Sequence, residues 1–156
     1  MSQTTTPSQS KPMSKANRFV TFMLRSPLSV FMSGILLITV TGRKSGRAIS
    51  TPVNYVRVGE TILITSRVNR TWWKNLRGGA PVTVRINGKT YRGDGNVIED
   101  RAAVEQELLR FFRATKRTIA GIHLTPDGQP TKPEKFARVL ATRVVVSISN
   151  LQRQPR

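Results

Sequence analysis

The chain has no cysteine and a single histidine, His123, among its 156 residues. Without thiols it can form no disulfide, thiolate nucleophile or cysteine-ligated metal centre. A single imidazole gives little support to a histidine metal site or a catalytic dyad. Negative charge is also scarce, because 8 Asp and Glu stand against 26 Lys and Arg, and the acidic residues form no metal-ligand pattern. We therefore expect no metal site and assign no catalytic residue.

The sequence also lacks an apolar run long enough to span a membrane. Its longest uncharged stretch, residues 26–42, contains Pro27 and several Ser, Thr and Gly residues, and it falls short of a spanning helix. Arg25 and Pro27 interrupt the only segment that resembles a signal-peptide core. We expect a cytoplasmic protein.

Length and composition fit one folded domain with an unusually basic surface. The hydrophobic fraction is 38% and the net charge is +18. Residues 1–13 are mostly Ser, Thr, Gln and Pro and predict a disordered tail. We expect a single domain over residues 14–150, beginning with a helical segment at 14–33, and a second tail at 151–156.

From residue 35 onward, alternating and β-branched apolar residues predict strands. Gly59 and the pair Asn87-Gly88 separate neighbouring runs, and Asn-Gly is a strong hairpin signal because both residues tolerate positive φ. Antiparallel pairing should follow. The predicted strands are Ile35–Val40, Ile49–Val58, Thr61–Ser66, Val82–Ile86, Thr90–Ile98 and Val144–Ile148.

Helical spacing of apolar residues predicts four helical regions around these strands. They are an N-terminal pair within Phe19–Met32, two turns from Asn69 or Arg70 with Trp72 and Leu76 on one face, a longer helix after Asp100 with the stripe Val104, Leu108, Phe111 and Phe112, and Pro133–Leu140. Strands with helices inserted at one side predict an α+β fold, whose simplest form is a small, partly open antiparallel barrel.

The most unusual short segment is a basic loop between the first two predicted strands. Residues 41–47 read TGRKSGR. The two glycines can aim backbone N–H groups at one point, and three cations add donors suited to phosphate. The spacing is not that of a Walker loop, which has four residues between its glycines and leads into a helix. The loop is a candidate anion site, with a solvated hairpin tip as an equal alternative.

A second basic group flanks the two tryptophans. Its members are Arg67, Arg70, Lys74 and Arg77. On a helix, the last three would share one face. Together with the loop they could hold an extended polyanion, while an indole could stack on a planar ring. The simpler alternative for Trp72 is packing in the core with Leu76.

In their order along the chain, these motifs resemble those of the deazaflavin-dependent nitroreductase family. Members of that family are split β-barrel flavin and deazaflavin oxidoreductases. The resemblance extends from Ile35 to Glu99 and rests on ILLITVTGRKSG, Thr51-Pro52, and the W-x-x-N-L pattern at residues 72–76. It implies a split barrel that binds coenzyme F420, with FMN as the alternative cofactor. It also implies hydride transfer to a conjugated acceptor, such as a nitroaromatic or a quinone.

The resemblance assigns cofactor-binding roles to particular residues. Arg43, Lys44, Ser45, Gly46 and Arg47 would grip the cofactor phosphate, whose oligoglutamate tail is also anionic; Thr51, Pro52 and Val53 would line the ring; Ser66 and Arg67 would lie near it; and Trp72 and Asn75 would close the pocket. The proton donor stays unassigned. In this arrangement the protein positions and the cofactor reacts.

Two other classes of function remain as alternatives. A non-catalytic or FMN-using barrel could bind a lipid or other apolar ligand, with the amphipathic segment Phe19–Met32 making peripheral contact with a membrane. Nucleic-acid binding is motivated by the charge, but it ranks last because the arginines are scattered and no nucleic-acid module is visible. The sequence is compatible with a monomer or a homodimer.

Overall fold

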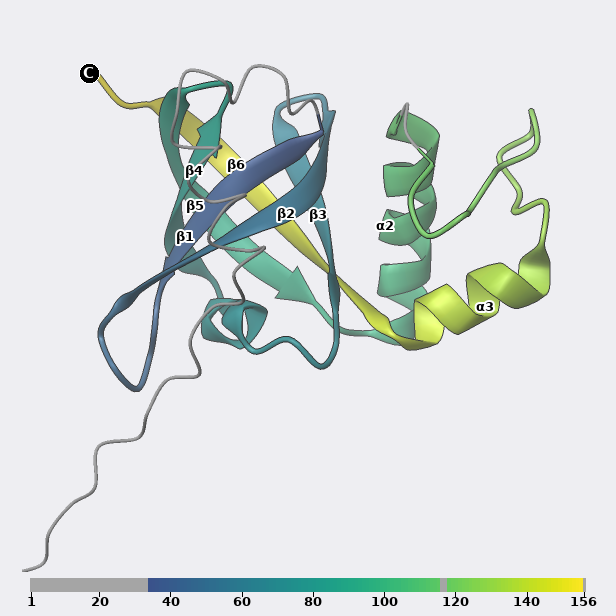
Figure 1. Ribbon diagram of the computed structural model, residues 1–156, viewed down its shortest axis with the longest axis horizontal. Coiled ribbons are helices and arrows are strands. Elements are labelled where there is room, and N and C mark those ends of the chain that lie inside the picture. The colour runs from purple at the N-terminus through teal and green to yellow at the C-terminus, as the bar shows by residue number, and fades with distance from the viewer. Residues whose placement is uncertain (1–33, 116–117, 156) are drawn as a thin grey trace, which may run out of the picture.

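Six antiparallel strands form a barrel with two helices packed against its outside (Figure 1). The structure is a computed structural model, and it describes residues 34–115 and 118–155. The strands are β1 (Ile35–Thr41), β2 (Ala48–Val58), β3 (Thr61–Arg67), β4 (Ala80–Ile86), β5 (Lys89–Ile98) and β6 (Arg143–Arg153). The α+β barrel expected from the sequence is confirmed. The expected helical segment at 14–33 and the tail at 1–13 lie outside the described residues.

The barrel is closed by hydrogen bonding all the way round, in the order β1-β2-β3-β6-β5-β4. A partly open barrel was expected, and the difference lies at the seam between β1 and β4. There Leu37 pairs with Arg85, and Thr39 pairs with Thr83. Both strands carry interior apolar residues at alternate positions, so pairing their edges buries these residues and satisfies the backbone of both.

The hairpin between β4 and β5 confirms the Asn-Gly prediction. Asn87 has φ 48° and Gly88 has φ 75°. Two successive positive φ values are what a type I′ turn requires, and this turn matches the twist of the strands that it joins. By the register of β1 against β4, this hairpin lies at the end of the barrel opposite the 42–47 loop.

The interior of the barrel is a single apolar core, and a short helix closes one of its ends. This helix is η2 (Trp72–Leu76), which buries Trp72, Trp73 and Leu76. The sequence predicted two turns of helix from Asn69 or Arg70, but η2 is a 3-10 helix of five residues. The indole of Trp73 donates to the carbonyl of Arg67 at 3.2 Å, and this contact holds the preceding residues as a turn.

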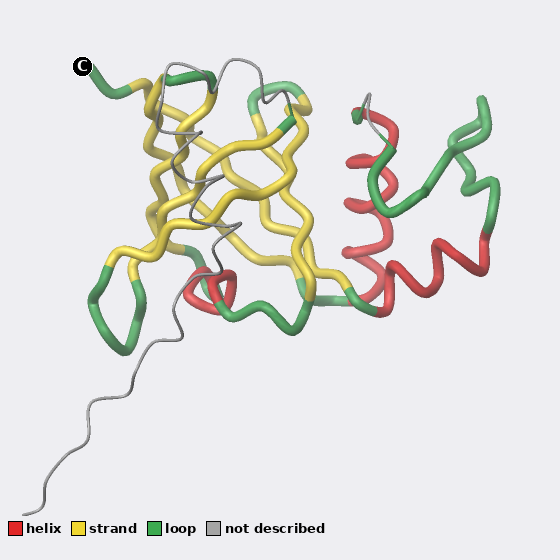
Figure 2. The backbone as a smooth tube through the Cα atoms, in the orientation of Figure 1, coloured by secondary structure: helices red, strands yellow, loops and turns green. Residues whose placement is uncertain are grey.

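The two α-helices lie beside the barrel (Figure 2), and a second core of buried residues lies beneath them. α2 (Arg101–Ala114) begins at Asp100, whose side chain accepts a hydrogen bond from the N–H of Ala103 at 3.1 Å. Its predicted stripe is confirmed, because all four members are buried. α3 (Pro133–Ala141) adds Phe136. Val56, Leu63 and Val145 complete this core from the outer face of the sheet.

The last strand runs further than the sequence suggested. Residues 151–153 were expected in a tail, but β6 continues to Arg153, where it pairs with Tyr91 of β5. Leu151 packs against the interior core, so ending the strand at residue 150 would expose an apolar side chain. Among the described helices, none is long and apolar enough to cross a membrane.

Candidate functional site

The 42–47 loop is a compact turn held by its own backbone. The N–H of Gly42 donates to the carbonyl of Arg47 at 2.8 Å, and the N–H of Gly46 donates to the carbonyl of Gly42 at 2.8 Å. Ser45 Oγ accepts from the N–H of Arg47 at 3.2 Å. Gly46 has φ +67°, which glycine adopts without strain, whereas Gly42 is needed for close approach: a Cβ there would lie 2.6 Å from Ser45 Oγ.

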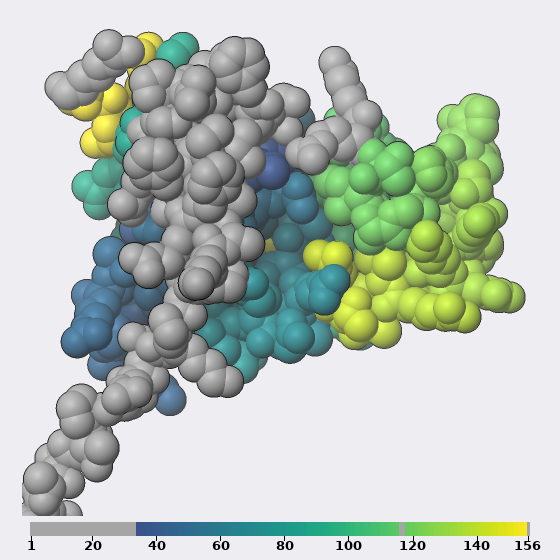
Figure 3. All heavy atoms as spheres, in the orientation of Figure 1, coloured from purple at the N-terminus to yellow at the C-terminus, as the bar shows by residue number. Residues whose placement is uncertain are grey.

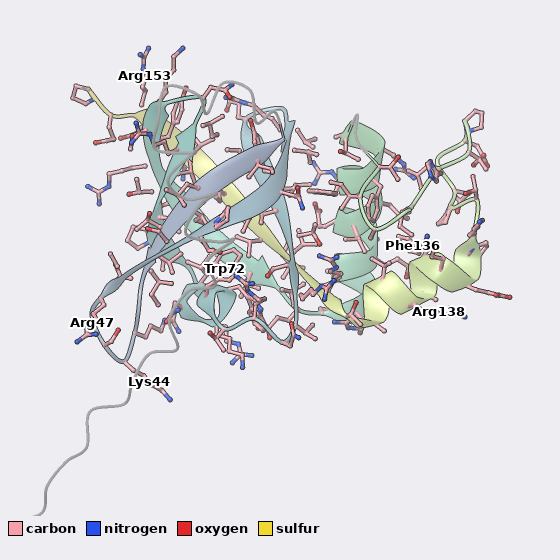
Figure 4. The ribbon with its side chains drawn as sticks, viewed as in Figure 1. Lys44, Arg47, Trp72, Phe136, Arg138 and Arg153 are labelled. Atoms are coloured by element: carbon pink, nitrogen blue, oxygen red, sulfur yellow. The ribbon has the colours of Figure 1, made fainter. Side chains whose placement is uncertain are left out.

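This conformation leaves donors at the tip of the loop. Within residues 34–115 and 118–155, the N–H groups of Lys44 and Ser45 have no hydrogen-bond partner. The side chains of Lys44 and Arg47 are exposed and form no ion pair with a described residue. Figure 4 shows both extending outward at one side of the barrel. Two cations beside two free N–H groups can bind an oxyanion.

Arg43 instead fixes the loop against η2. Its N–H donates to Asn75 Oδ1 at 2.9 Å, and its guanidinium donates to the carbonyl of Arg77. Asn75 in turn donates through Nδ2 to the carbonyl of Trp72 at 3.0 Å. The loop and the W-x-x-N-L segment, which are far apart in the sequence, are therefore joined through the Asn75 amide.

Thr51, Ser66 and Trp72 meet at the same end of the barrel but are buried. Their exposed fractions are 4%, 6% and 5%. Trp72 Nε1 donates to Ser66 Oγ at 3.2 Å, and the guanidinium of Arg70 donates to Thr51 Oγ1 at 3.2 Å. These contacts tie η2 and the segment before it to β2 and β3. In this arrangement Trp72 and Ser66 satisfy each other, Arg70 satisfies Thr51, and all three buried side chains support the frame of the site.

The other predicted site residues divide between two surfaces. Pro52 and Val53 are half-buried on β2 beside Thr51. Arg67 is exposed at the end of β3 and lines a separate cavity beside α3. The structure thus brings the loop and η2 together, while it turns Arg67 away from them. No sequence pattern indicates the link between Arg70 and Thr51, because it depends on how distant segments meet.

The predicted common face of Arg70, Lys74 and Arg77 does not form. Arg70 precedes η2, and Arg77 follows it and binds Glu99 through two hydrogen bonds of 2.9 and 3.0 Å. The hydrogen bond from Arg77 lowers the pKa of the Glu99 carboxyl. The guanidinium of Arg77 lies 5.2 Å from the centre of the Trp73 ring, so its charge is already used within the protein.

The single histidine is far from this region. His123 belongs to the connection between α2 and α3, which Figure 1 shows across the barrel from the 42–47 loop. It lines a cavity of about 470 Å³ with other residues of that connection. Within the described residues, no cluster of His, Cys, Asp and Glu could hold a metal ion.

Solved structures place this architecture among split-barrel proteins. A structure described as a domain-swapped dimer is 14% identical, with 85% of this chain and 95% of the other covered and a TM-score of 0.52. The FAD and heme binding protein from Mycobacterium smegmatis is 13% identical over 83% of this chain and 65% of its own, with a TM-score of 0.50. At these identities the likeness shows the fold alone, and that fold is a split β-barrel.

The family is shown by the sequence itself. The model of the F420H(2)-dependent quinone reductase family matches residues 23–122, which is more than half of the chain. The protein belongs to this family. It is an F420-dependent oxidoreductase, and its cofactor is coenzyme F420. An F420 reductase is also similar, at 14% identity over 86% of this chain and 92% of the other, with a TM-score of 0.45. No curated protein matched the chain.

The residues present fit the anionic part of this cofactor. A phosphate needs several donors converging from one side. The tip of the 42–47 loop offers two exposed cations and two free N–H groups, with no carboxylate of the described residues paired to them. Figure 3 shows the blue loop region at the edge of the molecule, so a phosphate bound at its tip would remain in reach of solvent.

Proposed function

We propose that the protein reduces a quinone with F420H2, and that the 42–47 loop anchors the cofactor through its phosphate. The observation that carries this proposal is the conformation of the loop: Lys44 and Arg47 are exposed and form no ion pair with a described residue, and no described residue accepts a hydrogen bond from the N–H groups of Lys44 and Ser45. Membership of the quinone reductase family supports the choice of acceptor. Nitroaromatics are a second acceptor class, because they also accept a hydride.

The roles proposed for the site residues follow from their contacts. Lys44, Ser45 and Arg47 bind the phosphate directly, while Arg43 and Gly46 maintain the shape of the loop. Thr51, Pro52 and Val53 offer the edge of β2 to the ring. Ser66, Trp72 and Asn75 hold η2 in place beneath it. Arg67 is assigned to the acceptor side, because it lines the cavity at α3.

The protein's contribution to the reaction is positioning. When bound, F420H2 supplies a hydride, which together with one proton from solvent converts a quinone to its hydroquinone. The chain restrains the cofactor at its charged end and offers β2 to its ring. No side-chain nucleophile is required, which suits a protein without cysteine.

The test is a titration of the purified protein with F420 and, separately, with FMN. Lys44→Gln combined with Arg47→Gln removes two exposed cations that form no ion pair with a described residue, so folding should be unaffected. Each charge-assisted hydrogen bond contributes about 1.5–3 kcal/mol, so the loss of two should lower the affinity for F420 at least roughly 100-fold. A matched control is Lys89→Gln combined with Arg92→Gln, on the hairpin at the opposite end of the barrel.

Unchanged F420 affinity in the loop variant would contradict the proposed anchor. Tight binding of FMN without binding of F420 would contradict the proposal that the loop anchors F420. Reduction is then followed anaerobically with F420H2 and a neutral naphthoquinone, and in parallel with a nitroaromatic. Faster reduction of the quinone is expected, and oxidation of F420H2 by the nitroaromatic alone would reverse the proposed choice of acceptor.

A further inference from the structure

A second basic region lies on the outer face of the barrel, beside α3. It is a cavity of about 630 Å³, which we call the α3 cavity. Its lining includes Arg67, Val68, Lys135, Arg138, Val139 and Arg143. In Figure 4 the labelled Arg138 lies on the opposite side of the molecule from Lys44 and Arg47. The volume is within the range of small-molecule sites.

Two arginines oppose each other directly in this cavity. Arg67 of β3 and Arg143 of β6 are partners in the strand register. Both alternate with residues of the interior core region, Ser66 and Val144, so both lie on the outer face of the sheet. Like charges in directly opposed positions destabilise a sheet. The sequence could not reveal this pair, because 75 intervening residues separate its members.

The positive charge of the cavity has no counterpart among the described residues. No Asp or Glu lines it, and the guanidinium of Arg143 forms no hydrogen bond or ion pair with residues 34–115 or 118–155. Partial burial, and secondarily the charge of Arg67, lower the pKa of Arg143. Arg77 differs, because it has Glu99 as a partner. An oxyanion would relieve the repulsion between Arg67 and Arg143.

The cavity also has an apolar part. Val68 is the one exposed large hydrophobic residue among the described residues, with an exposed fraction of 38%. Val139 also lines the cavity. The side chain of Thr142, also in the lining, is occupied by the carbonyls of Arg138 and Val139. The surface therefore suits a ligand with an acidic group attached to an apolar body.

We propose that the α3 cavity binds the acidic group of the electron acceptor, so that the preferred substrates are aromatic quinones carrying a carboxylate. This inference deepens the proposed function and rests on it, because the bound acid is a substrate only if the protein reduces quinones. The oxyanion could also come from the cofactor tail. The acceptor is favoured because the 42–47 loop already supplies cations and free N–H groups on the other side of η2.

The test uses two molecules of the same shape, anthraquinone-2-carboxylate and anthraquinone-2-carboxamide. Calorimetry of each with the cofactor-free protein gives direct binding, and kcat/KM with F420H2 gives turnover. The protein should prefer the acid about tenfold or more. Lys135→Gln combined with Arg138→Gln should abolish the preference and leave the F420 affinity unchanged. Lys89→Gln with Arg92→Gln, which removes the same charge elsewhere, should retain it.

Equal binding of acid and amide by the unaltered protein, or binding of neither, would overturn the proposal. If the α3 variant weakens F420 instead of the acid, the cavity belongs to the cofactor tail and the acceptor assignment is overturned. The proposed function fails separately, if F420H2 reduces no quinone. In that case, acid binding that depends on Lys135 and Arg138 would still identify the cavity as an anion site and would overturn its assignment to an acceptor.

Discussion

The 42–47 loop and the α3 cavity lie on either side of η2 and carry their positive charge differently. Lys44 and Arg47 extend into solvent, where an unpaired charge costs little. Arg143 is partly buried opposite Arg67, where an unpaired charge is destabilising. The net charge of +18 is therefore a weaker indication of binding partners than the burial of each cation.

The largest effect should come from weakening η2, which lies between the two regions. Trp72→Ala deletes a 5% exposed indole from the end of the barrel core and should lower the free energy of unfolding by about 3–5 kcal/mol. Trp72→Phe keeps most of the volume and should cost less. Urea unfolding measures both. A loss near zero for Trp72→Ala would mean that η2 does not close the core.

A smaller change should separate the two regions. Asn75→Ala removes the amide that joins Arg43 to the carbonyl of Trp72, at a cost of about 1 kcal/mol. Affinity for F420 should fall several-fold, because the loop loses its support, while binding of an anthraquinone acid should not change. Calorimetry tests both ligands, with Gln106→Ala on α2 as an exposed amide control. Equal losses for both ligands would contradict the separation of the sites.

The repulsion inside the α3 cavity predicts a substitution that stabilises the protein. Arg143→Gln removes one of two opposed like charges and should raise the free energy of unfolding by about 0.5 kcal/mol without ligand. It should weaken binding of the acidic acceptor at the same time. Thermal unfolding at low salt measures the first effect. A clear loss of stability would show that Arg143 has a structural role instead.

The smallest effect concerns Arg77 and Glu99, which are oppositely charged, unlike the pair in the α3 cavity. The pKa of Glu99 is lowered from 4.5, chiefly by its hydrogen bond to Arg77, so the stabilisation is present above pH 4.5 and is lost as pH falls through the folded-state pKa. Glu99→Gln should therefore lower Tm slightly at neutral pH but not in acid. Glu105→Gln, on the exposed side of α2, should be neutral at both. A Tm difference that persists in acid would contradict the ion-pair account.

Much of the fold could be predicted because its signals are local. Alternating residues indicated the strands, Asn87-Gly88 indicated a hairpin, and the stripe after Asp100 indicated α2. Closure of the barrel, the short form of η2 and the extension of β6 depend on contacts between distant segments. A local pattern does not contain the register of one strand against another.

The candidate site divides in the same way. The cations of the loop are visible in TGRKSGR, but the link from Arg43 to Asn75 spans 32 positions. Burial of Ser66 and Trp72 follows from closure of the barrel end, so their predicted contact with a cofactor ring became a supporting role in our proposal. No sequence pattern indicated the cavity residues Arg143, Lys135 and Arg138, because each has ordinary neighbours in the sequence.

The most direct test of the central claim is a crossed titration at moderate salt. F420 and anthraquinone-2-carboxylate are each titrated into the unaltered protein, the variant Lys44→Gln, Arg47→Gln, and the variant Lys135→Gln, Arg138→Gln. The first variant should lose affinity only for F420 and the second only for the acid. Loss of both ligands in either variant, or of neither in both, would contradict the existence of two separate anion sites.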